Sequence, residues 1–132
     1  MKVKFYLVDD SEPFRNAIKL FIESELGHIV IGEASDGSIA VSDQTIKDCD
    51  IVLMDIMMKE MDGITAAKKL LWENPNLRII AITGNEEAVF LRLLVNSGFY
   101  GCVFKNQIFN ELNEAIDIVM KGKRSFPSRI KI

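Results

Sequence analysis

The sequence is poor in the residues that build disulfide frameworks and zinc clusters. Its 132 residues include two cysteines and one histidine, and no CxxC pair occurs. A single histidine, His28, cannot form a zinc site without further ligands. Both cysteines, Cys49 and Cys102, lie in or beside apolar strand-like runs, so we expect them to be small buried side chains in a reducing compartment. These scarcities argue against a disulfide scaffold and a zinc module.

Long apolar runs and an excess of basic charge are also missing. No apolar stretch reaches the length that spans a bilayer, and residues 1–4 lead directly into a strand-like run that leaves no room for a signal peptide. The net charge is −3 at pH 7, with no basic face that would bind nucleic acid by bulk charge. The sequence contains no P-loop motif, so nothing in it indicates a nucleotidase. We expect one cytoplasmic domain without membrane contact and without direct nucleic acid contact.

What is present is a regular alternation of strand-like and helix-like segments. Apolar runs rich in β-branched residues alternate five times with segments whose apolar residues recur at helical spacing. This alternation predicts a doubly wound α/β fold, with a five-stranded parallel sheet and helices on both sides. The expected strands are 3–8, 29–34, 51–54, 77–82 and 100–104, and the expected helices are 12–26, a weak one around 39–46, 63–73, 86–96 and 107–120.

Polar side chains stand where four of these strands end. Asp9 and Asp10 follow the first strand, Asp55 follows the third, Thr83 the fourth and Lys105 the fifth. Each alone has an ordinary explanation, such as a helix cap, a strand end or a surface lysine. Because the carboxyl ends of parallel strands share one edge, where such sheets bind ligands, we expect these side chains to gather. Three crowded carboxylates need a divalent cation, and oxygen ligands suit Mg²⁺ or a similar hard ion such as Mn²⁺.

This set of groups favours phosphoryl transfer onto Asp55. A cation, a hydroxyl and an ammonium are what a transferring phosphoryl group needs around its oxygens. A flavodoxin-like cofactor binder would need a glycine- and hydroxyl-rich loop after the first strand, whereas residues 9–13, Asp-Asp-Ser-Glu-Pro, would repel a phosphate. An aspartyl-nucleophile hydrolase of the haloacid dehalogenase type places its two carboxylates two residues apart and carries a cap domain. Here the aspartates are adjacent.

The motif set resembles the receiver domain of bacterial two-component response regulators, over essentially the whole chain. The residues that carry the resemblance are, in order, Asp9-Asp10, Asp55, Met61-Asp62-Gly63, Thr83 and Lys105. The resemblance implies a flavodoxin-like (βα)5 fold with strand order 2-1-3-4-5. It also implies a signalling domain that assists its own phosphorylation and dephosphorylation, not an enzyme.

The resemblance assigns roles to individual residues. It implies that a sensor histidine kinase phosphorylates Asp55, and that Thr83 and Lys105 hold the phosphoryl group. It also implies that Mg²⁺ is held by Asp9, Asp10, Asp55 and the backbone carbonyl of Met57. The neighbouring methionines Met54, Met57, Met58 and Met61 we interpret as core and loop packing.

Four positions depart from the family pattern. Cys102 stands where an aromatic usually reports the state of the threonine, so the usual threonine–aromatic switch lacks its aromatic. Asn106 replaces a proline, and we expect a trans Lys105–Asn106 bond with Asn106 capping the last helix. Lys59, also at a proline position, adds a cation near the site. Gly84, often alanine in the family, is expected to leave open space beside the phosphoryl group and to affect its lifetime.

The remaining expectations concern partners and boundaries. Helix 86–96 is apolar over more than one face, which favours a partner surface, and the resemblance suggests a homodimer through this helix, the fifth strand and the fifth helix. We expect a receiver domain at 1–121 and a tail or linker start at 122–132. That tail is similar to the stretch that joins receivers to helix-turn-helix output domains of transcriptional regulators. The alternatives are a stand-alone receiver in a phosphorelay and an aspartyl-nucleophile phosphatase.

Overall fold

Five short apolar runs form one parallel sheet in the computed structural model, which describes residues 2–58 and 60–127. Every strand boundary lies within one residue of its predicted place. The order in the sheet is β2-β1-β3-β4-β5, which confirms the predicted topology. The strands are β1 (Lys4–Val8), β2 (Ile29–Ala34), β3 (Ile51–Asp55), β4 (Arg78–Thr83) and β5 (Gly101–Phe104).

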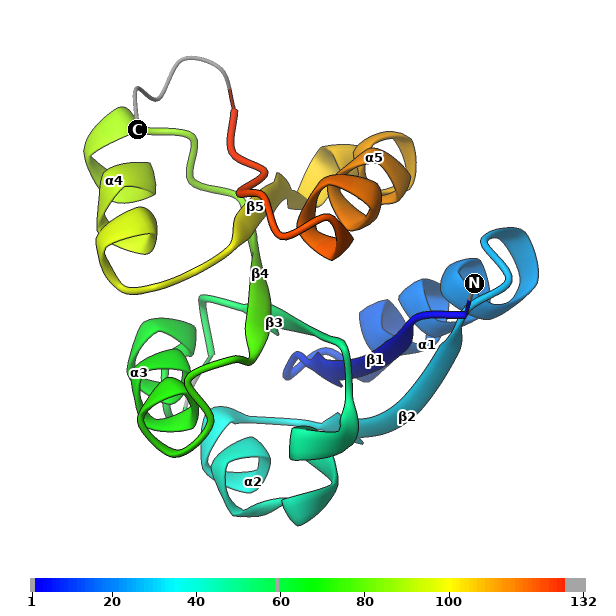
Figure 1. Cartoon of the computed structure of the whole chain (residues 1–132), viewed down its shortest axis with the longest axis horizontal. Helices are drawn as coiled ribbons and strands as arrows, with labels where there is room; N and C mark the ends of the chain where they lie inside the picture. Colours follow the sequence, from blue (N-terminus) through cyan, green and yellow to red (C-terminus); the bar gives the residue numbers. More distant parts are fainter. Residues whose placement is uncertain (1, 59, 128–132) are drawn as a thin grey trace.

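Helices cover both faces of the sheet. Figure 1 shows α1 and α5 on one face and α2, α3 and α4 on the other. The helices are α1 (Glu12–Leu20), α2 (Gly37–Ser42), α3 (Gly63–Glu73), α4 (Ala88–Asn96) and α5 (Ile108–Met120). The described residues also form three shorter helical segments: the π-helical η1 (Phe21–Glu25), which continues α1, and the 3-10 segments η2 (Gln44–Asp48) and η3 (Lys105–Gln107).

The strands are apolar because both faces of the sheet are buried. In β3, Ile51 and Leu53 face the core cluster under α1 and α5, while Val52 and Met54 face the cluster under α2, α3 and α4. All five residues of β3 are buried. Neighbouring side chains of a strand point to opposite faces. The continuous apolar run is therefore what a central parallel strand requires.

Local signals in the sequence set the starts of three helices. The side chains of Ser11, Asp36 and Asp62 accept hydrogen bonds from backbone N–H groups three residues later, as helix N-caps do. The predicted stop at Gly27 is also found, with a φ of 73° that favours glycine. The weak second helix exists but is divided, because Asp43 ends α2 and caps η2 by accepting from the Thr45 N–H.

One predicted helix start and one predicted helix cap were wrong. Helix α4 begins at Ala88 and not at Glu86, because the Asn85 side chain accepts from the Glu87 N–H and holds residues 85–87 as a turn. Asn106 does not cap α5. It lies inside η3, since the chain leaving β5 tightens into a 3-10 turn and α5 follows only at Ile108. The trans Lys105–Asn106 bond is confirmed, as no cis peptide occurs among the described residues.

The methionine prediction is right in three of four places. Met54 is buried, and Met58 and Met61 pack against the core. Met57 was placed wrongly, because its side chain lies in the loop after β3 and is 77% exposed. Lys59 lies outside the described residues.

Helix α4 exposes apolar side chains, as expected. Leu91 and Leu94 are buried, whereas Val89 is 79% and Leu93 45% exposed. Cys49 and Cys102 are buried, with no disulfide between them. Over residues 2–58 and 60–127, none of the helices combines the length and the apolar character needed to cross a bilayer.

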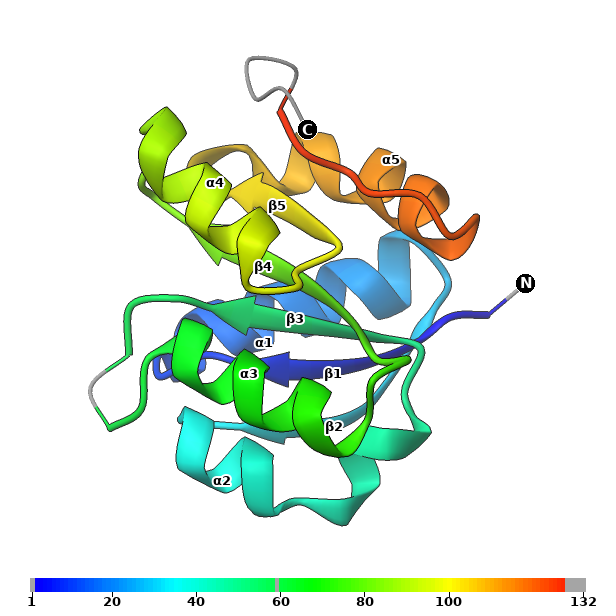
Figure 2. The same ribbon diagram turned by 60° about the vertical axis from the view of Figure 1, so that its left-hand side comes forward.

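The segment after α5 returns to the sheet and runs beside β5 (Figures 1 and 2). The Cys102 N–H donates to the Ser125 carbonyl at 2.9 Å, and the Ser125 N–H donates to the Tyr100 carbonyl at 2.8 Å. Gly101 and Ser125 form a parallel bridge, and Phe126 packs against the core. Residues 123–126 thus cover the outer edge of β5. The predicted boundary between a receiver domain at 1–121 and a tail at 122–132 stays a prediction.

Candidate functional site

The carboxylate of Asp55 lies at the carboxyl end of the central strand β3. This strand is flanked by β1 and β4, and Asp55 is 4% exposed. The backbone register pairs Asp55 with Ile82 of β4, one residue before Thr83. The buried strand therefore delivers a carboxylate to the edge of the sheet where ligands bind in this class of fold.

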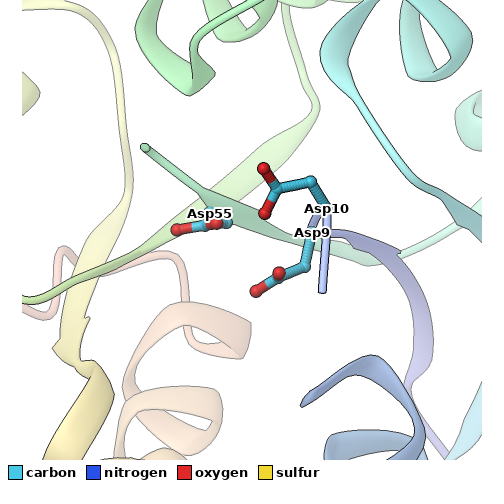
Figure 3. Close-up of side chains that lie close together, drawn as sticks. All are labelled: Asp9, Asp10 and Asp55. Carbon is cyan, nitrogen blue, oxygen red and sulfur yellow. The ribbon is translucent and has the colours of Figure 1, made fainter. Parts of the chain in front are cut away.

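Asp9 and Asp10 leave the neighbouring strand β1 at the same edge. Asp9 is 3% exposed, and Asp10 is exposed. One carboxylate oxygen from each of Asp9, Asp10 and Asp55 can be chosen so that all three lie within 4.8 Å of one another. Figure 3 shows the three side chains gathered around one space. The structure thus brings together the three carboxylates that the sequence predicted.

Asp9 is fixed from several sides. Its Oδ1 accepts from the Ser11 N–H at 2.8 Å, its own N–H donates to the Ala34 carbonyl at 3.1 Å, and its carbonyl accepts from Arg15 Nη1 at 2.6 Å. Its Oδ2 is buried and has no hydrogen-bond donor among the described residues. An acceptor left in this state is costly unless a cation or donor meets it. Because Ser11 caps α1, Asp10 is not needed as the cap.

The donor set fits a hard divalent cation. The three side chains offer only oxygen, which suits Mg²⁺ or Mn²⁺. The buried Asp9 Oδ2 accepts no hydrogen bond from the described residues, and the Lys105 ammonium lies 3.5 Å from it. These observations favour a cation between the ends of β1 and β3. Met57 lies two residues beyond Asp55, and its backbone hydrogen-bonds the Asp55 carboxylate. A role for the Met57 carbonyl stays a proposal.

The electrostatics of Asp55 reflect this crowding. Burial, and then the charge of Asp9, raise the pKa of Asp55 from 3.8 to about 6, while the Lys105 ammonium and the Met57 backbone hydrogen bond act in the opposite direction. A bound cation would favour the charged form further. Asp55 is therefore a carboxylate that needs compensating positive charge.

Thr83 and Lys105 stand at the same edge. Thr83 ends β4 and is 1% exposed, and its Oγ1 accepts from the Asn85 N–H at 3.0 Å. Lys105 directly follows β5, with Nζ 3.5 Å from Asp9 Oδ2 and 4.0 Å from Asp55 Oδ2. The ammonium is thus within ion-pair range of two of the carboxylates.

Two glycines shape the loops around Asp55. A Cβ on Gly63 would collide with the Asp55 carbonyl oxygen and would lie 2.9 Å from Ile56 Cα. Only glycine therefore allows the start of α3 to close against the end of β3. A Cβ on Gly84 would meet nothing within 4 Å, which confirms the expected open space. Its consequence for phosphoryl lifetime stays a prediction.

Two residues at the site were not predicted. Helical periodicity placed Phe14 on the core face of α1, yet the Lys105 ammonium lies 4.3 Å from the centre of its ring. Arg15 holds the Asp9 carbonyl and pairs with Glu33 at 3.2 Å. Periodicity reports which face of a helix is buried. It carries no information about a partner from a distant segment.

The fold and the site define a doubly wound α/β domain with an acidic centre at the carboxyl edge of its sheet. The family described as the response regulator receiver domain matches residues 5–117. The chain belongs to this family of signalling domains, and the resemblance seen in the sequence is confirmed.

Characterised proteins and solved structures that are similar to the chain are also response regulators. The chain is 31% identical to the transcriptional regulatory protein LiaR of Bacillus subtilis over 97% of this chain and 61% of LiaR. It is 30% identical to the response regulator GacA of Pseudomonas syringae over 97% of this chain and 60% of GacA. The chain thus spans about three fifths of these relatives. A LuxR-family response regulator from Aurantimonas superposes with a TM-score of 0.90 at 28% identity, covering 98% of this chain and 93% of that one.

Proposed function

We propose that the domain accepts a phosphoryl group on Asp55 from a sensor histidine kinase, in a reaction that requires Mg²⁺ or Mn²⁺. The observation that carries this proposal is a buried carboxylate with two further carboxylates within 4.8 Å and an ammonium 4.0 Å away. A structural ion pair would not need the second and third carboxylates. A phosphoryl acceptor needs the cation that they would hold.

In the proposed step an Asp55 oxygen attacks phosphorus in line as the bond to the kinase histidine breaks. The bonding electron pair stays on the histidine nitrogen, and an acyl phosphate forms. The Thr83 hydroxyl donates to one phosphoryl oxygen, and the Lys105 ammonium pairs with another. Asp9, Asp10, Asp55 and the Met57 carbonyl would hold the ion, which when bound offsets the negative charge of the phosphoryl group.

The same groups serve the return reaction. Water that attacks the acyl phosphate meets the same hydroxyl and ammonium, so the domain assists its own dephosphorylation as well as its phosphorylation. The open space beside Gly84 gives that water room. The domain therefore works as a switch whose state lasts as long as the phosphoryl group, and not as an enzyme that turns over a separate substrate.

The test is incubation with Mg²⁺ and acetyl phosphate, followed by intact mass. Wild type should gain one phosphoryl group, whereas Asp55→Asn and wild type in excess EDTA should gain none. An adduct on both proteins, or on neither, would rule out the role of Asp55. An adduct that forms equally well in EDTA would rule out the cation.

We also propose that the domain is the regulatory part of a cytoplasmic transcriptional regulator and forms a homodimer through α4, β5 and α5. Relatives named as transcriptional regulatory proteins extend beyond the region matched here. A solved structure of RcsB, 25% identical, is described as two RcsB dimers bound to two parallel DNAs. The apolar side chains Val89 and Leu93 that α4 exposes support the dimer. The receiver itself makes no nucleic acid contact in this proposal.

A further inference from the structure

The Lys105 ammonium, which in our proposal meets a phosphoryl oxygen, lies near two carboxylates without a short contact to either. Lys105 opens the 3-10 turn after β5, where its flexible stem projects into a partly open site, and its side chain is 38% exposed. Its Nζ lies 3.5 Å from Asp9 Oδ2 and 4.0 Å from Asp55 Oδ2. Both distances exceed the roughly 2.7–2.9 Å of a charge-assisted hydrogen bond. Neither carboxylate therefore fixes the ammonium by itself.

An aromatic face supplies the missing contact. Lys105 Nζ lies over the ring of Phe14, 4.3 Å from its centre. This is well inside the distance of about 6 Å at which a ring quadrupole attracts an ammonium. The contact joins the first turn of α1 to the end of β5, across the acidic edge of the sheet.

The ring is itself firmly placed. The Phe14 N–H donates to the Ser11 Oγ cap at 3.3 Å, and the side chain packs against the core cluster under α1 and α5. The N–H of the same Ser11 donates to Asp9 Oδ1 at 2.8 Å. One turn, residues 9–14, thus sets both the Asp9 carboxylate and the aromatic face.

We propose that Phe14 is a positioning residue for Lys105. Its ring holds the ammonium between Asp9 and Asp55, so that the cation is in place before the phosphoryl group arrives. A lysine side chain loses conformational entropy when it is fixed in one position. Because the ring already holds the ammonium before the reaction, less of this entropy has to be lost when the phosphoryl group is transferred. In this proposal Phe14 acts on the phosphoryl group only through Lys105, whose ammonium it contacts. This inference rests on the proposed function.

The first test is a double-mutant cycle with acetyl phosphate and Mg²⁺, in which no kinase contact can interfere. Phe14→Leu keeps an apolar side chain and removes the ring face, and should slow phosphorylation about three-fold, as expected for one cation–π contact at a partly exposed site. Phe14→Tyr keeps the ring and should retain the wild-type rate. In a Lys105→Ala background, Phe14→Leu should change nothing further.

The second test reads the geometry without any phosphoryl donor. In the NMR spectrum of wild type and of Phe14→Tyr, the Lys105 ε-methylene protons should be shifted upfield by the ring current, and in Phe14→Leu the shift should vanish. A shift absent from wild type overturns the inference. So does a Phe14→Leu rate loss that persists in Lys105→Ala, or no rate loss at all.

These outcomes separate the two proposals. A wild-type protein that gains no phosphoryl group, or an Asp55→Asn protein that gains one, overturns the proposed function. A normal adduct that is confined to Asp55 but insensitive to the residue at position 14 overturns only the role of Phe14.

Discussion

Asp55 is an acid whose pKa in the folded protein lies above its ordinary value, because burial and Asp9 raise it from 3.8 to about 6. Between pH 3.8 and about pH 6, the two pKa values of Asp55, the folded protein binds more protons than the unfolded chain. Stability therefore falls as the pH rises through this window. Above it, the ionised Asp55 costs the metal-free protein about 2–3 kcal/mol.

Asp55→Asn, which keeps the shape and removes the charge, should therefore raise the free energy of unfolding in EDTA by about 2–3 kcal/mol at neutral pH. The gain should shrink towards zero as the pH falls below about 4. Urea unfolding across this range measures it. Asp48→Asn, at an exposed position, is the control for loss of one negative charge. A gain that does not depend on pH would contradict the argument.

At the scale of elements, the sequence predicted what local patterns determine. Every strand and the starts of α1 and α3 were predicted, because buried parallel strands are continuously apolar and because one or two residues identify a helix cap. The site followed from the strands, since their carboxyl ends share one edge. Asn106 was placed wrongly, because a good capping residue does not reveal that the chain first tightens into η3. The Phe14–Lys105 contact and the return of residues 123–126 to β5 depend on tertiary packing.

The segment 123–126 gives a prediction about an element. It lies against β5 only because Gly101 has no side chain, since a Cβ there would be 2.8 Å from the Ser125 carbonyl oxygen. Gly101→Ala should therefore displace this segment and cost about 1–3 kcal/mol, the worth of its two backbone hydrogen bonds. Hydrogen exchange should show lost protection at the Cys102 and Ser125 amides. The core strands should keep theirs.

Gly84→Ala is the matched control for this displacement. It makes the same chemical change at a position where the added Cβ meets open space, so the Cys102 and Ser125 amides should stay protected. Equal protection of these amides in the Gly101→Ala protein would show that steric contact with the glycine does not govern the segment. Loss of protection throughout the sheet would show general unfolding instead.

At the scale of the whole molecule, hydrogen bonds connect the site to the surface of α4. Thr83 Oγ1 accepts from the Asn85 N–H at 3.0 Å, and Asn85 Oδ1 accepts from the Glu87 N–H at 3.0 Å. Glu87 is the N-cap of α4. If the Thr83 hydroxyl turns to a phosphoryl oxygen, as we propose, the Asn85 N–H must follow its acceptor or lose it, and we expect the turn that precedes α4 to change. In this proposal the hydrogen-bonded route links phosphorylation at the sheet edge to the apolar side chains that α4 exposes.

Those side chains provide the last prediction. Val89 is 79% exposed in the first turn of α4, where an aspartate suits the helix dipole, so Val89→Asp should fold normally. If α4 forms the dimer surface, a charge there should weaken self-association of the phosphorylated protein at least tenfold, or about 1.4 kcal/mol, and leave the rate of phosphorylation unchanged. Sedimentation velocity after treatment with acetyl phosphate measures this change in self-association.

Trp72→Asp, at a side chain 87% exposed on α3, is the control. If Trp72→Asp disrupts the dimer and Val89→Asp does not, the interface lies over α3, and the hydrogen-bonded route from Thr83 to α4 does not carry the signal.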